Sequence, residues 1–233
     1  MSDRYFASER ITTEHVILTG TEAHHLIHVM RAKPELRVTL FDGSGGEFDA
    51  VVRRVGRSEV ELAVLGRREV DRELPLTLTL GVALPKGERQ RWLVEKAVEL
   101  GVGCLVPLET ARGVAQPVEN ALERLRRAVI EASKQCGRNR LMEIAEPRGW
   151  DAFLTDTAGV ACRLLAHPGP SGADIRPRPG EPVAIGIGPE GGFTDDEVAR
   201  ATAAGWQPVS LGPRILRVET AAIFLAALVA ARM

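Results

Sequence analysis

The sequence has little that would suit a disulfide-bonded, metal-binding or membrane-spanning protein. Its three cysteines, Cys104, Cys136 and Cys162, stand far apart and match neither a zinc-ligand pattern nor a CxxC redox pair. Unpaired cysteines, in a chain whose start has no apolar targeting core, predict a protein of the reducing cytoplasm. The longest apolar run, residues 221–231, is shorter than the roughly 20 residues that cross a bilayer. We therefore expect a buried helix there and no membrane partner.

The chain also lacks an excess of either charge, with 30 basic and 31 acidic side chains. A formal net charge of -1 argues against a wholly basic nucleic-acid-binding protein. It does not exclude a local basic face, because phosphates respond to clustered charge. Hydrophobic residues make up 45% of the 233 residues, so we expect a soluble protein of one large or two modest domains.

The first part of the chain predicts a small β-rich unit over residues 1–72. Its strands are expected at 37–41, 48–55 and 60–65. Thr21 is placed to cap a short helix that precedes them. The charged stretch 66–73 has no apolar period, which indicates a linker or an exposed strand end. We therefore place the domain boundary near residue 73.

From residue 74 onward, strand-like and helix-like segments alternate. Strands are expected at 76–84, 102–108, 160–166, 183–188 and 209–211, and helices at 87–100, 118–135, 195–204 and 218–231. Thr194 and Glu197 have the spacing of a capping box for the third helix. The alternation predicts an α/β fold with a mainly parallel sheet covered on both faces. The Pro- and Gly-rich stretch 169–182 predicts a mobile surface loop.

Two glycine-containing loops near the carboxyl end are the best indication of a ligand site. They run from 186 to 194 and from 211 to 220, and each leads from a short apolar strand. Glycine is needed where φ is positive or where no Cβ can be tolerated. Two such loops in one small region predict a pocket lined by main-chain groups.

The spacing of Gly186, Gly188 and Gly191 matches the dinucleotide-binding fingerprint, but the surrounding sequence does not. That fingerprint needs a helix that opens within the motif and an acidic residue about 20 positions later on a second strand. Here the helix is expected only after Thr194, and Ser210 stands where the acid should be. We therefore reject a dinucleotide fold.

The second loop carries charged residues whose roles the local pattern leaves open. Arg214 and Arg217 can bind phosphate at a helix start, whereas Glu219 can complement the helix dipole and Thr220 can cap the helix. The histidines, among them His167 at a strand end, have no metal-ligand spacing, so no metal is expected.

The helix expected at 118–135 separates an apolar stripe from a basic face. Glu131 is the only acid between residues 124 and 140. A solvated face is one interpretation. We favour a phosphate-contacting surface, because the cluster continues beyond the helix end and arginine forks suit phosphate oxygens. This basic cluster comprises Arg124, Arg127, Lys134, Arg138 and Arg140.

The two C-terminal loops resemble the signature of the SPOUT methyltransferases of the RsmE type, which methylate N3 of a uridine in 16S ribosomal RNA. The resemblance rests on Gly188-Pro189-Glu190-Gly191-Gly192-Phe193 and on Leu211-Gly212-Pro213-Arg214-Ile215-Leu216-Arg217-Val218-Glu219-Thr220-Ala221. Further segments that agree with it are His25 to Arg31, Glu95 to Gly101 and Glu131 to Arg138.

The resemblance implies a PUA-like RNA-binding β-barrel at 1–72 and a SPOUT domain at 73–233 whose last loops form a deep trefoil knot. It also implies a homodimer, for which the apolar closing helix would suit a buried face, and S-adenosylmethionine bent into the knot. The implied cofactor-binding residues are Leu165, Ala166, His167, Ile187, Gly188, Pro189, Glu190, Gly191, Gly192, Leu211, Gly212, Arg214, Ile215, Leu216, Thr220 and Ala221. The RNA-binding residues that we expect are His25, Arg31, Arg124, Arg127, Lys134, Arg138 and Arg140.

Methyl transfer to a ring nitrogen needs alignment of the reactants, and the uracil N3 proton must leave. We expect Arg217 or Arg138 to favour the uracil anion, and Glu190 or Glu219 to accept the proton or to orient an arginine. Other interpretations stay open: a SPOUT enzyme that modifies another base or a ribose, a non-catalytic RNA-binding protein, or a nucleotide-phosphate binder. The 16S rRNA substrate would be either naked or within the small ribosomal subunit.

Overall fold

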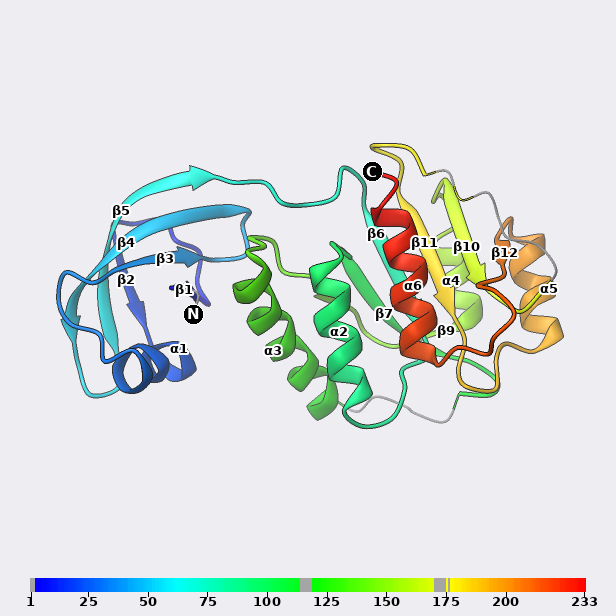
Figure 1. Cartoon of the computed structure of the whole chain (residues 1–233), viewed down its shortest axis with the longest axis horizontal. Helices are drawn as coiled ribbons and strands as arrows, with labels where there is room; N and C mark the ends of the chain where they lie inside the picture. Colours follow the sequence, from blue (N-terminus) through cyan, green and yellow to red (C-terminus); the bar gives the residue numbers. More distant parts are fainter. Residues whose placement is uncertain (1–2, 114–118, 170–174, 176) are drawn as a thin grey trace. The chain divides into compact units, whose positions relative to one another are not determined.

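The computed structural model describes residues 3–113, 119–169, 175 and 177–233, which form two compact units (Figure 1). The first unit contains Met1–Arg72 and Ser133–Leu141, and the second contains Glu73–Ala132 and Met142–Met233. The charge pattern had predicted a single boundary, near residue 73. The assignment of Ser133–Leu141 to the first unit was not expected. Helix α3 (Glu119–Cys136) therefore contributes residues to both units.

The first unit is built on a curled five-stranded sheet with the order β1-β3-β4-β5-β2 (Figure 1). Its strands are β1 (Arg4–Phe6), β2 (His15–Leu18), β3 (Arg37–Phe41), β4 (Gly46–Val55) and β5 (Val60–Glu69). The three longer strands confirm the prediction, whereas β1 and β2 were not predicted. Because β5 continues to Glu69, the first half of the charged stretch is an exposed strand end rather than a linker. This half-barrel has the architecture expected of a PUA-like domain.

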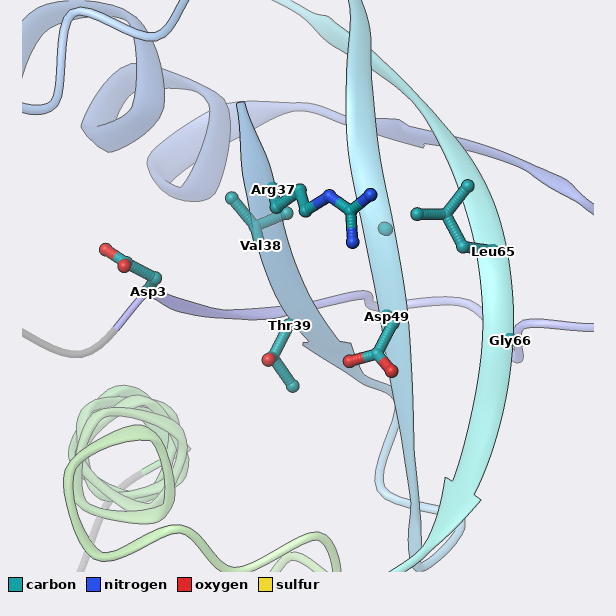
Figure 2. Close-up of a pocket in the computed structure, with 8 residues that line it drawn as sticks. Asp3, Arg37, Val38, Thr39, Asp49, Leu65 and Gly66 are labelled. Atoms are coloured by element: carbon teal, nitrogen blue, oxygen red, sulfur yellow. The ribbon is translucent and has the colours of Figure 1, made fainter. Parts of the chain in front are cut away.

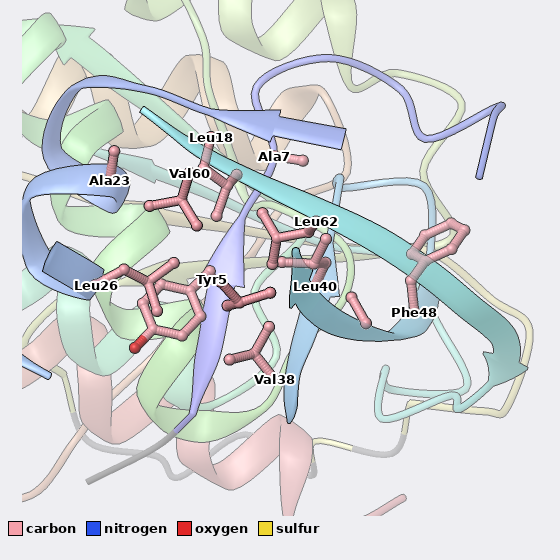
Figure 3. Packing of buried hydrophobic residues seen from close by; sticks show 12 residues of the cluster. Tyr5, Ala7, Leu18, Ala23, Leu26, Val38, Leu40, Phe48, Val60 and Leu62 are labelled. Carbon is pink, nitrogen blue, oxygen red and sulfur yellow. The ribbon is translucent and has the colours of Figure 1, made fainter. Parts of the chain in front are cut away.

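The concave side of this sheet is filled by one apolar core. Two short helical segments close it, α1 (Gly20–His24) and the π-helix η1 (His25–Val29). Figure 3 shows the ring of Tyr5 packed among aliphatic side chains that include Leu26, Leu40 and Leu62. The predicted cap at Thr21 was wrong, because Thr21 lies inside α1 and the N-cap residue is Thr19.

The second unit is built on a parallel seven-stranded sheet with the order β12-β10-β11-β6-β7-β8, in which β9 also pairs with β7. Its strands are β6 (Leu78–Val82), β7 (Cys104–Glu109), β8 (Glu143–Ile144), β9 (Arg148–Gly149), β10 (Cys162–Ala166), β11 (Val183–Ile187) and β12 (Gln207–Val209). All of its strand pairs are parallel, which confirms the predicted sheet type. The two-residue strands β8 and β9 were not predicted, and β12 ends before the predicted strand does.

Helices cover both faces of this sheet. They are α2 (Arg89–Glu99), α4 (Trp150–Asp156), α5 (Asp195–Ala203) and α6 (Val218–Ala230). Helix α6 packs on α2 and on the central strands β6 and β11, and α4 lies behind the sheet (Figure 1). Within the described ranges, no helix is both long enough and apolar enough to cross a bilayer. The trefoil knot stays a prediction, and most of the stretch 170–176 lies outside the described residues.

Candidate cofactor and substrate site

Three loops of the second unit leave its sheet at the same edge. Strands β10, β11 and β12 are parallel, so their last residues, Ala166, Ile187 and Val209, lie at one edge. The backbone N–H of His167 donates to the carbonyl oxygen of Val209 at 3.1 Å. Open parallel sheets bind ligands beyond the carboxyl ends of their strands. The structure thus brings the three predicted cofactor-binding segments together at the edge where a ligand is expected.

The loop after β11 is tightly packed on itself. A Cβ at Gly188 would lie 3.0 Å from the backbone nitrogen of Phe193, so a side chain there would force the loop to shift. The N–H of Gly192 donates to the carbonyl oxygen of Pro189 at 2.8 Å, and Gly192 has a φ of +68°. The guanidinium of Arg112 donates to the carbonyl oxygen of Gly191 at 2.8 Å. Contacts within the protein therefore hold this loop in place.

Aromatic packing also anchors this loop. The rings of Phe193 and Trp150 have centroids 4.5 Å apart, and Trp206 packs against the same indole. Gly186 faces this cluster, where its Cβ would lie 3.0 Å from the Trp150 ring. Gly186 and Gly188 are thus explained by packing within the protein, and neither is needed to explain ligand binding.

The loop after β12 offers more open main chain. Gly212 has a φ of +102°, and a Cβ added there would meet no atom within 4 Å. Gly192 likewise has open space beside it. Leu211 and Leu216 are half-buried, whereas Ile215 is 97% exposed. Open space against glycine peptides fits a ligand that lies on main-chain groups, as the resemblance implies for S-adenosylmethionine.

Helix α6 begins immediately after this loop, at Val218. Its N-cap residue is Arg217, so Thr220 does not cap the helix and lies exposed in the first turn. Arg214 and Arg217 are exposed and form no ion pair with the residues that the structure describes. Glu219 lies in the first helical turn, where the helix dipole favours a carboxylate.

A single arginine connects the two candidate carboxylates of the site. Arg89 is the first residue of α2, and its Nη2 donates to Oε1 of Glu190 at 3.2 Å. Its Nη1 lies 3.6 Å from Oε2 of Glu219. The Glu190 side chain is 52% exposed and the Glu219 side chain is 9% exposed. Sequence reasoning missed Arg89, although its place just after the strand β6 and a glycine turn puts it at the carboxyl edge of the sheet.

The capping box of α5 confirms the prediction and has a second role. Thr194 Oγ1 accepts from the N–H of Glu197, and the Glu197 carboxylate accepts from the N–H of Thr194 at 2.8 Å. The other carboxylate oxygen of Glu197 accepts from the N–H of Ala111 at 2.8 Å. One buried carboxylate thus ties the loop after β7 to the end of the loop after β11.

The predicted RNA-binding residues on the second unit are Arg124 and Arg127. Both are exposed on α3, and neither forms an ion pair within the described part of the chain. Their neighbour Arg126 is instead held by Glu119, Glu123 and Glu146 at 2.9 to 3.3 Å. An unpaired exposed arginine can bind a phosphate without first breaking an ion pair.

The remaining predicted RNA-binding residues belong to the first unit, and two of them need correction. Arg138 is only 4% exposed, so little of its side chain is open to a phosphate backbone or to a uracil in this structure. The ammonium of Lys134 is 2.9 Å from Glu22, and its side chain is 13% exposed. Both point to structural roles. Arg140 and Arg31 are exposed, and His25 is half-buried.

A surface hollow of about 400 Å³ lies on the first unit beside strands β3, β4 and β5 (Figure 2). Its charged lining consists of Arg37, Asp3 and Asp49. Two carboxylates beside one guanidinium do not suit a phosphate, and none of the predicted RNA-binding residues lines the hollow. Among the described residues, no group of histidine, cysteine and acidic side chains is arranged to hold a metal ion.

Comparison with known proteins decides the family. The model of an RNA methyltransferase domain matches residues 72–230, and the model of an RNA methyltransferase PUA domain matches residues 18–65. This chain belongs to that family of RNA methyltransferases. The ribosomal RNA small subunit methyltransferase E of a Synechocystis strain is 36% identical over 92% of this chain and 72% of its own length. The Bacillus subtilis protein of the same name is 30% identical over 89% of this chain and 86% of its own.

Solved structures agree with this assignment. A methyltransferase of Legionella pneumophila in complex with the bound cofactor SAM has a TM-score of 0.90 and 33% identity, and the match covers 99% of this chain and 98% of that one. The ribosomal RNA small subunit methyltransferase E of Neisseria gonorrhoeae, bound to S-adenosyl methionine, has a TM-score of 0.89 and 31% identity. That match covers 98% of this chain and 96% of the other.

Proposed function

We propose that this RNA methyltransferase transfers a methyl group from S-adenosylmethionine to N3 of a uridine in 16S ribosomal RNA. The observation that carries the proposal is the site at the carboxyl edge of the second sheet. There, open glycine peptides lie in the loops after β11 and β12, and the second of these loops leads to the buried carboxylate of Glu219. Family membership supplies the reaction class, and this geometry supplies residues that can perform it.

When bound, S-adenosylmethionine supplies an electrophilic methyl group. The residues that would hold it are the predicted ones from the three loops, with the peptide groups of Gly192 and Gly212 as the open surface. Leu211 and Leu216 are half-buried and can contact an apolar part of the cofactor. Arg112 and Phe193 hold the loop after β11 in place, and a loop fixed by such contacts lowers the ordering cost of binding.

The residues of this site can also prepare the uracil nitrogen. The N3 proton has to leave, and Glu219 or Glu190 can accept it, so that the nitrogen keeps its electron pair for the new bond. Arg217 is exposed beside Glu219 and can stabilise the charge that develops on the uracil oxygens. The burial of Arg138 leaves Arg217 as the remaining candidate for this role.

For RNA binding we propose the exposed arginines Arg124 and Arg127 of α3, with Arg31, Arg140 and His25 on the first unit. The phosphate contacts would position the RNA, because arginine forks match phosphate oxygens but carry no sequence information. The substrate is 16S rRNA, either free or in the small ribosomal subunit.

We also propose that the chain is a homodimer. Phe224 on α6 is 43% exposed and Trp92 on α2 is 44% exposed, on two helices that pack against each other. Large exposed apolar side chains on neighbouring helices favour a protein partner. Phe224→Asp should therefore lower the molar mass that light scattering measures from that of a dimer toward that of a monomer.

The reaction is tested with rRNA from a strain that lacks the protein. Purified enzyme with S-adenosylmethionine should restore one N3-methyluridine in that 16S rRNA, as detected by mass spectrometry. Arg217→Ala and Glu219→Gln should both slow single-turnover methylation at saturating cofactor. Restoration of a different modified base or of a ribose methyl group would replace the proposed target. A protein that binds no S-adenosylmethionine in calorimetry would instead be a non-catalytic RNA-binding protein.

A further inference from the structure

Arg89 joins three segments of the second unit that are distant in sequence. It opens α2, and its two terminal nitrogens face different carboxylates: Glu190 in the loop after β11, and Glu219 in the first turn of α6. The loop before α2 shares this edge of the sheet, because the N–H of Ala83 donates to the carbonyl oxygen of Ile187 at 2.9 Å. One guanidinium therefore fixes the relative positions of both carboxylates at the site.

The two carboxylates differ in their exposure and in the hydrogen bonds that they accept. Glu190 is largely exposed and accepts a hydrogen bond from Arg89. Oε2 of Glu219 is buried and accepts no hydrogen bond from the described part of the protein, although the Arg89 cation is 3.6 Å away. The nearby cation offsets the cost of burying the charge but leaves the hydrogen-bonding capacity of the oxygen unused. A buried acceptor of this kind points to an N–H donor that arrives with a ligand.

We propose that Arg89 is a positioning residue that presents Oε2 of Glu219 to the N–H of the target base, while it holds Glu190 at the rim. This proposal rests on the proposed function and assigns the proton-accepting role to one of the two carboxylates. In the step, the N–H bond breaks and the nitrogen keeps the electron pair. The proton forms an O–H bond at Oε2, which neutralises the carboxylate. Glu190 takes no proton.

A purely structural tie would have other consequences. If Arg89 only fastened α6 to the neighbouring loop, its loss would weaken stability and cofactor binding, and its effect would not depend on Glu219. If it acts through Glu219, its loss has little further effect once Glu219 no longer accepts a proton. Arg91 is a matched control on the same helix, since its guanidinium pairs with Glu95 at 2.7 Å on the exposed surface.

The test is a double-mutant cycle in single-turnover methylation of small ribosomal subunits from a strain that lacks the protein. At saturating S-adenosylmethionine, Arg89→Ala should lower the rate constant by about tenfold or more, with the cofactor Kd within about twofold of the parental value. Arg89→Lys should recover part of the rate, because a point charge replaces the fork. The double variant Arg89→Ala/Glu219→Gln should be no slower than Glu219→Gln, and Arg91→Ala should be unchanged.

Several outcomes would overturn the proposal. The first is a parental rate constant in Arg89→Ala or in Glu219→Gln. The second is a double variant Arg89→Ala/Glu219→Gln in which the two losses of rate multiply. The third is an effect of Arg89→Ala that is still seen in a Glu219→Gln background but disappears in a Glu190→Gln background. If Arg89→Ala does not fold, Arg89→Lys and Arg89→Lys/Glu219→Gln complete the same cycle. A wild-type enzyme that methylates no rRNA at all would contradict the proposed function, whereas a methylating enzyme with an additive cycle would contradict only the role of Arg89.

Discussion

Gly186 of β11 lies directly opposite Gly81 of β6, and the two glycines make room for aromatic rings on one face of the sheet. A Cβ at Gly81 would lie 2.5 Å from the Phe153 ring, and one at Gly186 would lie 3.0 Å from the Trp150 ring. Side chains at these positions would push the rings away from the strands. The same indole contacts Phe193, so this pair of glycines also determines how the loop after β11 is anchored.

Gly81→Ala should therefore destabilise the protein by about 2 kcal/mol, because overpacking a well-filled core forces side chains to shift. Urea unfolding measures the change. Gly159→Ala is the control, since a Cβ there meets no atom within 4 Å and its φ is not positive. Equal stability of the two variants would show that the Phe153 ring can move aside without cost.

Gly212→Ala should weaken S-adenosylmethionine binding in calorimetry. The φ of +102° is strained for any residue with a Cβ, and the added methyl group would enter the open space beside the peptide. Gly20→Ala imposes a similar backbone strain in the first unit, where the φ is +59°, and should leave the cofactor Kd unchanged. Unchanged affinity in Gly212→Ala would place the cofactor elsewhere.

The arginines of α3 allow a matched comparison of RNA binding. Arg124→Ala and Arg127→Ala should each weaken RNA binding and reduce the slope of log K against log salt by about 1. Arg126→Ala removes a neighbouring guanidinium that three glutamates already neutralise, so its salt slope should stay near the parental value. Equal effects of all three substitutions would indicate a diffuse charge effect instead of direct contacts.

Glu47 should make the stability of the protein sensitive to acid. Burial disfavours its charged form, but hydrogen bonds from Arg72 and Arg4 outweigh burial and hold the pKa of Glu47 below its ordinary value. A pKa that is lower in the folded state than in the unfolded state stabilises the fold above the unfolded pKa, which is about 4.3 for glutamate. This contribution is lost as the pH falls from about 5 through the folded pKa.

The measurement is the free energy of unfolding as a function of pH. Glu47→Gln should lower it by about 2 kcal/mol at pH 7 and should flatten its decline in acid. Glu69→Gln on the exposed end of β5 is the control and should change neither quantity appreciably. If the free energy of unfolding of Glu47→Gln declines in acid as steeply as that of the parent, the acid sensitivity belongs to other carboxylates. Asp42 is one of them: burial disfavours its charged form, but hydrogen bonds from Ser44 and Ile11 hold its pKa below the ordinary value.

The sequence predicted those elements whose residues carry a long, uninterrupted pattern. The apolar runs at β6 and β11 and the stripe on α3 were each sufficient to predict the element. The missed strands β8 and β9 have two residues each, which is too short for any period to show. Helix α4 has seven residues, and Gly149 at its start provides no side-chain cap, so its local signal is weak.

For the site, the sequence located the loops but not the contacts between distant segments. Glycine patterns indicated both loops, although Gly186 serves internal packing. Arg138 continues a basic cluster in sequence, but tertiary packing of the segment after α3 buries it. Arg89 and Glu219 are far apart along the chain, and only the fold brings their side chains together.

The return of Ser133–Leu141 to the first unit limits how this protein can be divided. Arg4 donates to the carbonyl oxygen of Gly137 at 3.2 Å and to Oδ1 of Asn139 at 2.7 Å, and Asn139 donates to the carbonyl oxygen of Val70 at 2.9 Å. A fragment that ended at Arg72 would lose all of these partners. A recombination event at that boundary would therefore transfer an incomplete first unit.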